Sequence, residues 1–260
     1  MPTQHDKAVR FRALHDGPAA FVIANPWDAG SARALAKLGF EALATSSGAS
    51  AAALGRRDGE LTRDEAIAHA RAIVQASDLP VAADLENGFG DDPADAARTV
   101  LLAAEAGVVG GSIEDASAEP RRIYPIEQAA ERIAAAAEAA RALPFPFTLT
   151  ARAENFLRGH ADLDDTIRRL QAYERAGADV LFAPALPDLA AVRAVCAALA
   201  KPVNFMVGIP GKSFSVAELQ AAGVRRISLA TSLYRAAMAG LTQAAAEVKT
   251  HGTFGYLDRL

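Results

Sequence analysis

The feature that most constrains the fold is a regular alternation of short apolar runs with longer Ala-, Glu- and Arg-rich stretches. The apolar runs are nearly continuous, which is typical of parallel strands covered on both faces. We expect strands at residues 21–25, 42–46, 81–84, 110–114, 147–152, 180–184, 202–207 and 226–230. Helical spacing predicts helices at 29–38, 62–77, 93–107, 126–142, 162–177, 187–199, 215–222 and 231–249.

Eight β–α units in one chain predict an α/β fold, a closed (β/α)8 TIM barrel that forms a single domain over residues 1–260. A doubly wound open sheet is the alternative for this rhythm. Ser215, followed by Glu218, has the spacing of a capping box. Glycines that favour left-handed backbone lie at the end of four helical stretches or directly after them, at Gly39, Gly107, Gly177 and Gly223.

Composition and charge exclude several classes of protein. The chain is 51% hydrophobic and 22% charged, as expected for a globular domain with a sizeable core. Its formal net charge is −4 and no basic block occurs, so we expect neither a nucleic-acid nor a membrane partner. The single cysteine, Cys196, lies on a helical apolar stripe and is interpreted as a core thiol. No apolar run approaches the roughly 20 residues of a membrane span and no secretory signal is present, so we expect a cytoplasmic protein.

Polar residues at the carboxyl ends of the predicted strands are the candidates for chemistry, because catalytic groups of parallel barrels lie there. They are Asn25, Asp28, Thr45, Ser46, Ser47, Gly48, Asp84, Glu86, Asn87, Glu114, Asp115, Arg152, Glu154 and, within the seventh strand, Asn204. This set is an acidic cluster with one arginine. The sixth strand ends in Pro184 and Ala185 and contributes nothing ionisable.

Three of these acids predict a metal site. Asp84 and Glu86 are two residues apart, so both point to the same side of an extended chain. Glu114 would reach the same cavity from the next strand. Converging carboxylates repel one another without a cation, and ligands that are all oxygen suit Mg²⁺ or Mn²⁺. The alternative is that each acid caps a helix or pairs with a surface arginine.

An anion site and a fixed cation accompany the acids. Ser46, Ser47 and Gly48 form a small-residue turn that can present amides and a hydroxyl to an anion. A plain tight turn is the alternative. Arg152 ends an apolar strand, where an unpaired charge is costly, so a carboxylate or an anionic substrate should partner it. A purely structural ion pair remains the alternative for this residue.

Several segments resemble the isocitrate lyase/phosphoenolpyruvate mutase superfamily, in order and over residues 18 to 245. The matching segments are NPWDAGSARALAKLGFEA at 25–42, TSSG at 45–48, LGRRDGEL at 54–61, DLENGFGD at 84–91, SIEDAS at 112–117 and ARAENFLRG at 151–159. The resemblance implies a Mg²⁺-dependent barrel enzyme whose last helix, here 231–249, is exchanged between the subunits of a homo-oligomer, a dimer or tetramer.

The resemblance also implies roles for individual residues. Asp84 would ligate Mg²⁺ directly, and Glu86 and Glu114 would do so directly or through water. Asp58 would reach the metal or substrate from its loop. Ser46, with the Ser47 and Gly48 amides, would hold the substrate carboxylate. Asn204 is a further candidate for substrate binding because of its place within the seventh strand, independently of the resemblance. Arg152 would stabilise the enolate oxygen.

One departure from the family matters for the reaction. The lyases of this superfamily carry K-[KR]-C-G-H in a loop after the fourth strand, where the cysteine handles a proton transfer. Residues 116–128 of this chain, ASAEPRRIYPIEQ, contain neither cysteine nor histidine. The chain therefore resembles the cysteine-less branch, which includes phosphonate mutases, phosphonopyruvate hydrolases and oxaloacetate decarboxylases.

The predicted function is that of a lyase or decarboxylase acting on a small, oxaloacetate-like 2-oxo or 2-hydroxy dicarboxylic acid through an enolate stabilised by Mg²⁺ and Arg152. Chemistry at a P–C bond is the alternative, since Arg121, Arg122 or Tyr124 could serve a phosphonate or a second carboxylate. A barrel that binds a carboxylate without turnover is a third possibility.

Overall fold

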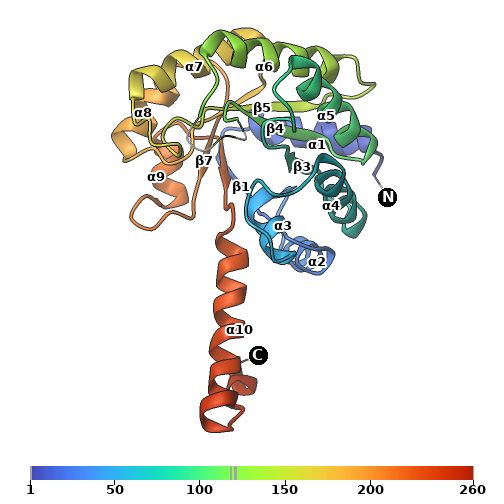
Figure 1. The fold of residues 1–260 in the computed structure, drawn as a ribbon, viewed down its shortest axis with the longest axis vertical. Helices are drawn as coiled ribbons and strands as arrows, with labels where there is room; N and C mark the ends of the chain where they lie inside the picture. The colour runs from blue at the N-terminus through green and yellow to red at the C-terminus, as the bar shows by residue number, and fades with distance from the viewer. Residues whose placement is uncertain (1, 118, 120–121, 260) are drawn as a thin grey trace.

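The computed structural model describes residues 2–117, 119 and 122–259. Its eight strands are β1 Phe21–Ile23, β2 Leu43–Ala44, β3 Val81–Asp84, β4 Gly110–Glu114, β5 Thr148–Arg152, β6 Val180–Phe182, β7 Val203–Met206 and β8 Arg226–Ser228. Its helices are α1 Gln4–Asp16, α2 Ala29–Lys37, α3 Ser47–Ala53, α4 Arg63–Ala76, α5 Pro93–Glu105, α6 Ile126–Arg141, α7 Leu163–Ala176, α8 Leu189–Ala197, α9 Val216–Ala221 and α10 Ser232–His251, followed by the 3₁₀ turn η1 Gly255–Arg259. Figure 1 shows their arrangement.

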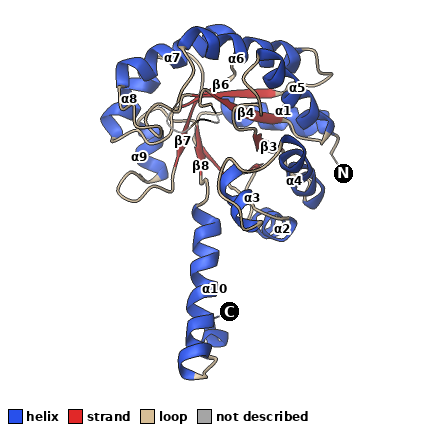
Figure 2. Ribbon diagram, in the orientation of Figure 1, coloured by secondary structure: helices blue, strands red, loops and turns tan. Residues whose placement is uncertain are grey.

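The strands form one parallel sheet whose neighbours follow sequence order, and β1 also pairs with β8. The ring is completed by a single bridge between Ala24, after β1, and Leu43 in β2. A doubly wound sheet would reverse its strand order at a switch point, so the predicted TIM-like barrel is confirmed. Helices surround the strands, as Figure 2 shows.

The strands occur where the apolar runs predicted them, but most are shorter by one to three residues at their ends. Gly39, Gly107, Gly177 and Gly223 have φ between +89° and +109°, as predicted. Ser215 and Glu218 form the predicted capping box at the start of α9. The glycines and the capping box are confirmed because the start and end of a helix depend on local backbone geometry, which nearby residues determine.

Two helices were not predicted as such. Helix α1 covers the amino-terminal end of the barrel, where Phe11 packs with Phe21 of β1. The buried positions of α1 in the structure are Ala8, Phe11 and His15, and most of its other residues are polar. The helix therefore lacks a clear apolar stripe in the sequence. Helix α3 begins directly after Ser46, where the sequence suggested a turn. The Ser46 hydroxyl caps it by accepting from the Ala49 amide.

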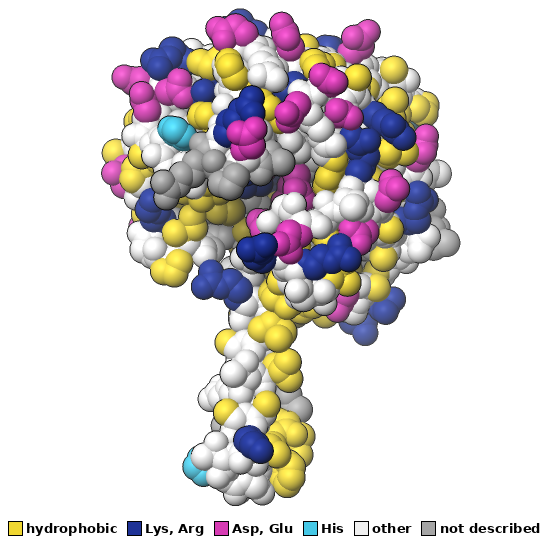
Figure 3. Space-filling view, viewed as in Figure 1, with side chains coloured by type: hydrophobic (Ala, Val, Ile, Leu, Met, Phe, Trp, Pro, Cys, Tyr) yellow, Lys and Arg dark blue, Asp and Glu magenta, His cyan; other side chains and the backbone are white. Residues whose placement is uncertain are grey.

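Helix α10 projects away from the barrel, as Figures 1 and 2 show. None of its residues is buried. Figure 3 shows hydrophobic side chains on this projection, and Met238 and Leu241 are 39% and 59% exposed. No helix in the described residues is both long and apolar enough to cross a membrane.

Candidate active site

A cavity of about 270 Å³ opens at the carboxyl ends of the strands, and all eight strands contribute to its lining. The turn Ser46–Gly48, the loop residue Asp58 and the start of α10 border it as well. A neighbouring hollow shares Asp58 and is lined by Glu86, Glu114 and Arg158. The predicted candidates therefore meet in one region, but Asp84 is the one predicted metal ligand that lines the first cavity.

Arg152, at the end of β5, is the charged centre of this region. Its Nη1 lies 3.3 Å from Glu114 Oε2 and 3.8 Å from Asp84 Oδ2. Its Nε donates to Glu154 Oε1. Burial alone would lower the pKa of Arg152, but Glu154, Glu114 and Asp84 raise it overall. Adjacent pairing of β3, β4 and β5 brings these acids to the arginine, so Arg152 is held charged in one place.

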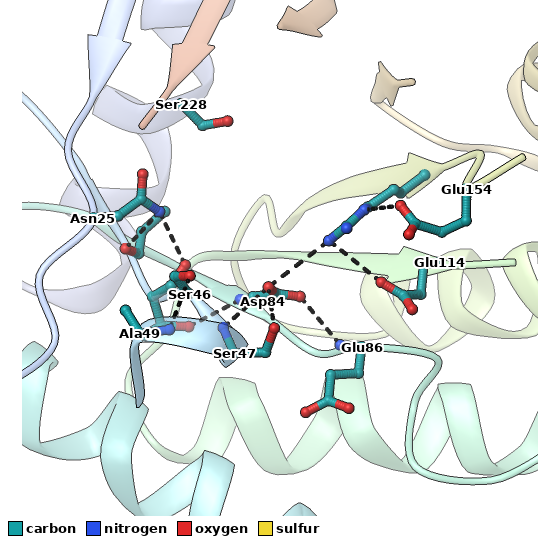
Figure 4. Close-up of polar contacts among 12 residues, drawn as sticks. Asn25, Ser46, Ser47, Ala49, Asp84, Glu86, Glu114, Glu154 and Ser228 are labelled. Atoms are coloured by element: carbon teal, nitrogen blue, oxygen red, sulfur yellow. Dashed lines mark hydrogen bonds and ion pairs between the residues drawn. The ribbon is translucent and has the colours of Figure 1, made fainter. Parts of the chain in front are cut away.

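The Asp84 carboxylate is positioned by backbone and side-chain donors. Its Oδ2 accepts from the Ser47 amide at 3.1 Å and from the Ser47 hydroxyl at 3.0 Å. Its Oδ1 accepts from the Glu86 amide at 3.3 Å. Since a carboxylate oxygen has two lone pairs, Oδ1 retains one for a further ligand. Figure 4 shows these contacts.

Glu86 faces a different way from the other acids. Figure 4 shows its side chain directed away from Glu114, and its backbone has a left-handed φ of 48°. Its carboxylate forms no hydrogen bond or ion pair within the described residues. Burial and the negative charges of Asp84 and Asp58 raise the pKa of Glu86 to about 8.

The charge balance of the region favours a cation. Five carboxylates, Asp58, Asp84, Glu86, Glu114 and Glu154, interact with one another and with two arginines, Arg152 and Arg158, so negative charge is in excess within this group. Two further arginines, Arg226 and Arg235, line the cavity outside this group. Burial raises the pKa of Glu114 well above its usual value, and Glu154 and Asp84 add to this rise. The side chains available are all oxygen donors, which suits a hard ion such as Mg²⁺. Across the described residues, however, no three acidic, His or Cys side chains are already grouped around one metal position.

The Ser46–Gly48 turn is the amino terminus of α3. The amide and hydroxyl of Ser47 are both engaged by Asp84, so the donors left for a substrate carboxylate are the Ser46 hydroxyl and the Gly48 amide. A Cβ on residue 48 would lie 3.0 Å from the Thr231 methyl carbon and 3.2 Å from Asp58 Oδ2. A side chain on residue 48 would therefore crowd the Asp58 loop and the start of α10, and glycine leaves room for their close approach to this turn.

Asn204 lies at the cavity with both ends of its amide engaged. Its Nδ2 donates to Ser228 Oγ, and its Oδ1 accepts from Arg226 Nε at 2.8 Å. Arg226 itself lines the cavity and is 6% exposed, yet it is absent from the candidates predicted from the sequence. An arginine inside a predicted buried strand was the signal that could have identified it.

Four of the polar strand-end residues have structural roles instead. Asp28 caps α2, and Asn25 bridges the Thr45 carbonyl and the Leu229 amide. Asn87 donates to the Tyr124 hydroxyl. Asp115 is buried and accepts hydrogen bonds from Arg169 and Tyr173. These four side chains therefore hold the fold around the cavity together.

The described residues of the segment after β4 place few groups near the cavity. Tyr124 is fully buried, and its hydroxyl donates to Asp91 at 2.6 Å. Arg122 pairs with Glu119 on the surface. Arg121, the third candidate for binding a phosphonate, lies outside the described residues. Tyr124 and Arg122 are thus occupied elsewhere, and Arg158 lies close to Glu114, at 3.5 Å.

Comparison with known proteins identifies the family. A family model described as phosphoenolpyruvate phosphomutase matches residues 11–249. A solved structure from Burkholderia cenocepacia J2315, described as a "putative lyase/mutase", has a TM-score of 0.96 and 53% identity, covering 99% of this chain and 92% of that one.

Two further relatives are enzymes with carboxylic acid substrates in their names. A "Probable 2-methylisocitrate lyase 1" of Corynebacterium glutamicum is 35% identical over 88% of this chain and 77% of its own length. The structure of an oxaloacetate acetylhydrolase in complex with its product oxalate has a TM-score of 0.90 and 26% identity, covering 98% of this chain and 90% of that one. The barrel, the motifs at its strand ends and these matches agree, and the chain belongs to the phosphoenolpyruvate mutase/isocitrate lyase superfamily of enzymes.

Proposed function

We propose that the chain is a Mg²⁺-dependent lyase or decarboxylase that breaks the bond at C3 of a small 2-oxo or 2-hydroxy dicarboxylic acid. The observation that carries this proposal is Arg152, held between Asp84, Glu114 and Glu154 at a cavity bordered by free donors of the Ser46–Gly48 turn. The relatives named for 2-methylisocitrate and oxaloacetate support this substrate class.

Asp84, Glu86 and Glu114 would hold the metal, and Asp58 would contribute from its loop. When bound, Mg²⁺ supplies positive charge that polarises the 2-oxo group and stabilises an adjacent negative oxygen. The free lone pair of Asp84 Oδ1 fits this role, as does the Glu86 carboxylate, which has no partner among the described residues. Glu86 would have to turn toward Asp84 when the metal binds.

Arg152 would donate hydrogen bonds to the oxygen on which negative charge develops. Since its ion pairs hold it in place before substrate arrives, little reorganisation opposes this stabilisation. The Ser46 hydroxyl and the Gly48 amide would bind and orient the substrate carboxylate. Loss of CO₂ requires no general acid at the leaving group, so these residues suffice to form the enolate, and a solvent water would then protonate its C3 to give the 2-oxo acid product.

The segment after β4 supports placement in the cysteine-less branch of the family. Residues 116–128 contain no Cys or His, and the Tyr124 hydroxyl is engaged by Asp91 and Asn87. No thiol of this chain would protonate a carbanion there, because Cys196 belongs to α8. P–C bond chemistry is the second candidate, favoured by the match to the phosphoenolpyruvate phosphomutase model.

The test is an assay of pyruvate release from oxaloacetate, phosphonopyruvate and 2,3-dimethylmalate in the presence of Mg²⁺. We expect activity on at least one of these, lost with EDTA and in Asp84→Ala. Asp78→Ala, which removes an exposed aspartate remote from the cavity, serves as the matched control and should be fully active. Saturable oxalate binding without turnover of any of the three would instead identify a carboxylate-binding barrel.

We also propose that α10 packs on a second copy of the chain, as a helix exchanged within a dimer or tetramer. Its unburied apolar side chains would otherwise remain in water. The double variant Met238→Glu/Leu241→Glu should have the mass of a monomer by light scattering. Gln243→Glu, at an exposed polar position of the same helix, should leave the assembly intact; monomeric wild-type protein would contradict the proposal.

A further inference from the structure

Arg226 is a buried cation whose partners are all neutral. Its Nε donates to Asn204 Oδ1 at 2.8 Å, its Nη2 to Thr150 Oγ1 at 3.0 Å, and its Nη1 to His15 Nε2 at 3.4 Å. The His15 ring can accept this bond because its Nδ1 donates to the Phe11 carbonyl. No carboxylate in the described residues pairs with Arg226.

A buried guanidinium without an anion is unfavourable. Burial lowers the pKa of Arg226 to about 9, and no acidic group offsets that effect. A guanidinium has five N–H groups, and three of them have protein partners. Because the residue lines the catalytic cavity, an anionic group of a ligand could reach the remaining two.

Arg226 and Arg152 line the same cavity, and Arg226 lies deeper along β5 through its contact with Thr150. Thr150, which anchors the Arg226 guanidinium, is two residues before Arg152 on β5, and both side chains line the cavity. The Cα atoms of residues two positions apart on a parallel strand are separated by about 6.6 Å. The terminal carbons of an extended four-carbon diacid are about 4 Å apart, and hydrogen bonds of about 2.8 Å extend its reach at each end.

We propose that Arg226 binds a second anionic group of the substrate at the floor of the cavity. This inference rests on the proposed function, in which the 2-oxo or 2-hydroxy acid end is held near Arg152 and Asp84. The substrate would then lie along the barrel axis between two cations. The distal group of the substrate is an anion both before and after the reaction, so its ionic contact with Arg226 is equally strong throughout. Arg226 therefore contributes to substrate binding and substrate specificity rather than to bond cleavage.

The test compares ligands that differ in the distal group alone. Malate is lactate with one additional carboxylate, and oxalate has the metal-binding end without a distal arm. Calorimetric titration in Mg²⁺ should show malate binding to the wild-type protein at least about tenfold more tightly than lactate, for one enantiomer. Equal affinity for malate and lactate would overturn the inference. Failure of the wild-type protein to bind oxalate in a Mg²⁺-dependent manner would refute the proposed function itself.

Variants then assign the effect to a residue. Arg226→Met should weaken malate binding at least about tenfold while oxalate and lactate change less than about twofold. Arg226→Lys keeps the positive charge and should fold even if the Met variant does not. It should retain part of the preference for malate over lactate, and complete loss of that preference in a folded Lys variant would count against a charge contact.

Arg225→Met is the matched control, because Arg225 is the neighbouring residue and donates to the Pro18 carbonyl outside the cavity. This variant should bind all three ligands normally. Selective loss of malate binding in Arg158→Met, with none in Arg226→Met, would place the distal group in the neighbouring hollow and overturn the inference.

Discussion

His15 should make the stability of the protein fall in mild acid. The imidazole is 5% exposed, packs edge-on against Phe11 and Phe21, and accepts a hydrogen bond from Arg226. Burial, and then the charge of Arg226, lower its pKa from 6.5 to about 3. Between these values the unfolded chain takes up a proton that the folded protein does not, so acidification favours unfolding.

The magnitude follows from the two pKa values. Between pH 7 and pH 5 this one group should remove about 2 kcal/mol of unfolding free energy, since each unit of pH well below 6.5 costs about 1.4 kcal/mol. Buried acids with raised pKa values, such as Asp115 and Asp179, act in the opposite direction, because protonation of such a group stabilises the fold. Comparison with a variant of His15 cancels their contribution.

The assay is urea unfolding at pH 7, 6 and 5 of the wild-type protein, His15→Gln and the exposed control His251→Gln. Glutamine can still donate to the Phe11 carbonyl and accept from Arg226, but it does not titrate. The His15 variant should lose about 2 kcal/mol less than the wild-type protein between pH 7 and 5, and the His251 variant should follow the wild type. If His15→Gln loses as much stability as the wild type, the argument from the buried neutral imidazole is wrong.

Three further predictions concern single positions. Arg152→Lys should lower kcat/KM for the active substrate by about 10²–10³-fold with the fold retained, because a lysine cannot reproduce the fixed fork of donors; steady-state kinetics showing less than a tenfold loss would contradict the assigned role. Gly88→Ala should lower the unfolding free energy by about 2–4 kcal/mol, since residue 88 has φ +82° and a Cβ would lie 2.8 Å from the Ala96 Cα. Gly211→Ala, at φ +75° with open space around it, isolates the backbone cost and should lose about 1 kcal/mol; equal losses would show that the contact is irrelevant. Burial raises the pKa of Cys196 to about 11, so its reaction with a disulfide reagent at pH 8 should be much slower than in urea, and equally fast labelling of the folded protein would indicate an open thiol.

The sequence was sufficient for the barrel and for the acids around Arg152. A parallel strand covered on both faces requires a continuous apolar run, so each strand leaves a local signal in the chain. The order of pairing in a barrel then places β3, β4 and β5 side by side, and residues at their carboxyl ends come together. The grouping of Asp84, Glu114 and Arg152 therefore follows from the positions of three strands in the chain.

The sequence was not sufficient for the direction and partners of individual side chains. Glu86 is two residues from Asp84, yet the left-handed backbone at Glu86 turns its carboxylate away. Asp115 is adjacent to Glu114, yet it faces Arg169 and Tyr173 in the barrel wall.

The chain by itself determined the eight strands, the ends of several helices and which acids share one rim, because these depend on apolar periodicity, local caps and strand order. The tertiary structure alone decided that α1 covers the floor of the barrel and brings His15 to Arg226, 211 positions away in the chain. It likewise decided that α10 extends from the barrel with its apolar side chains uncovered. Contacts between residues so far apart depend on how completed elements pack, and no local pattern encodes that packing.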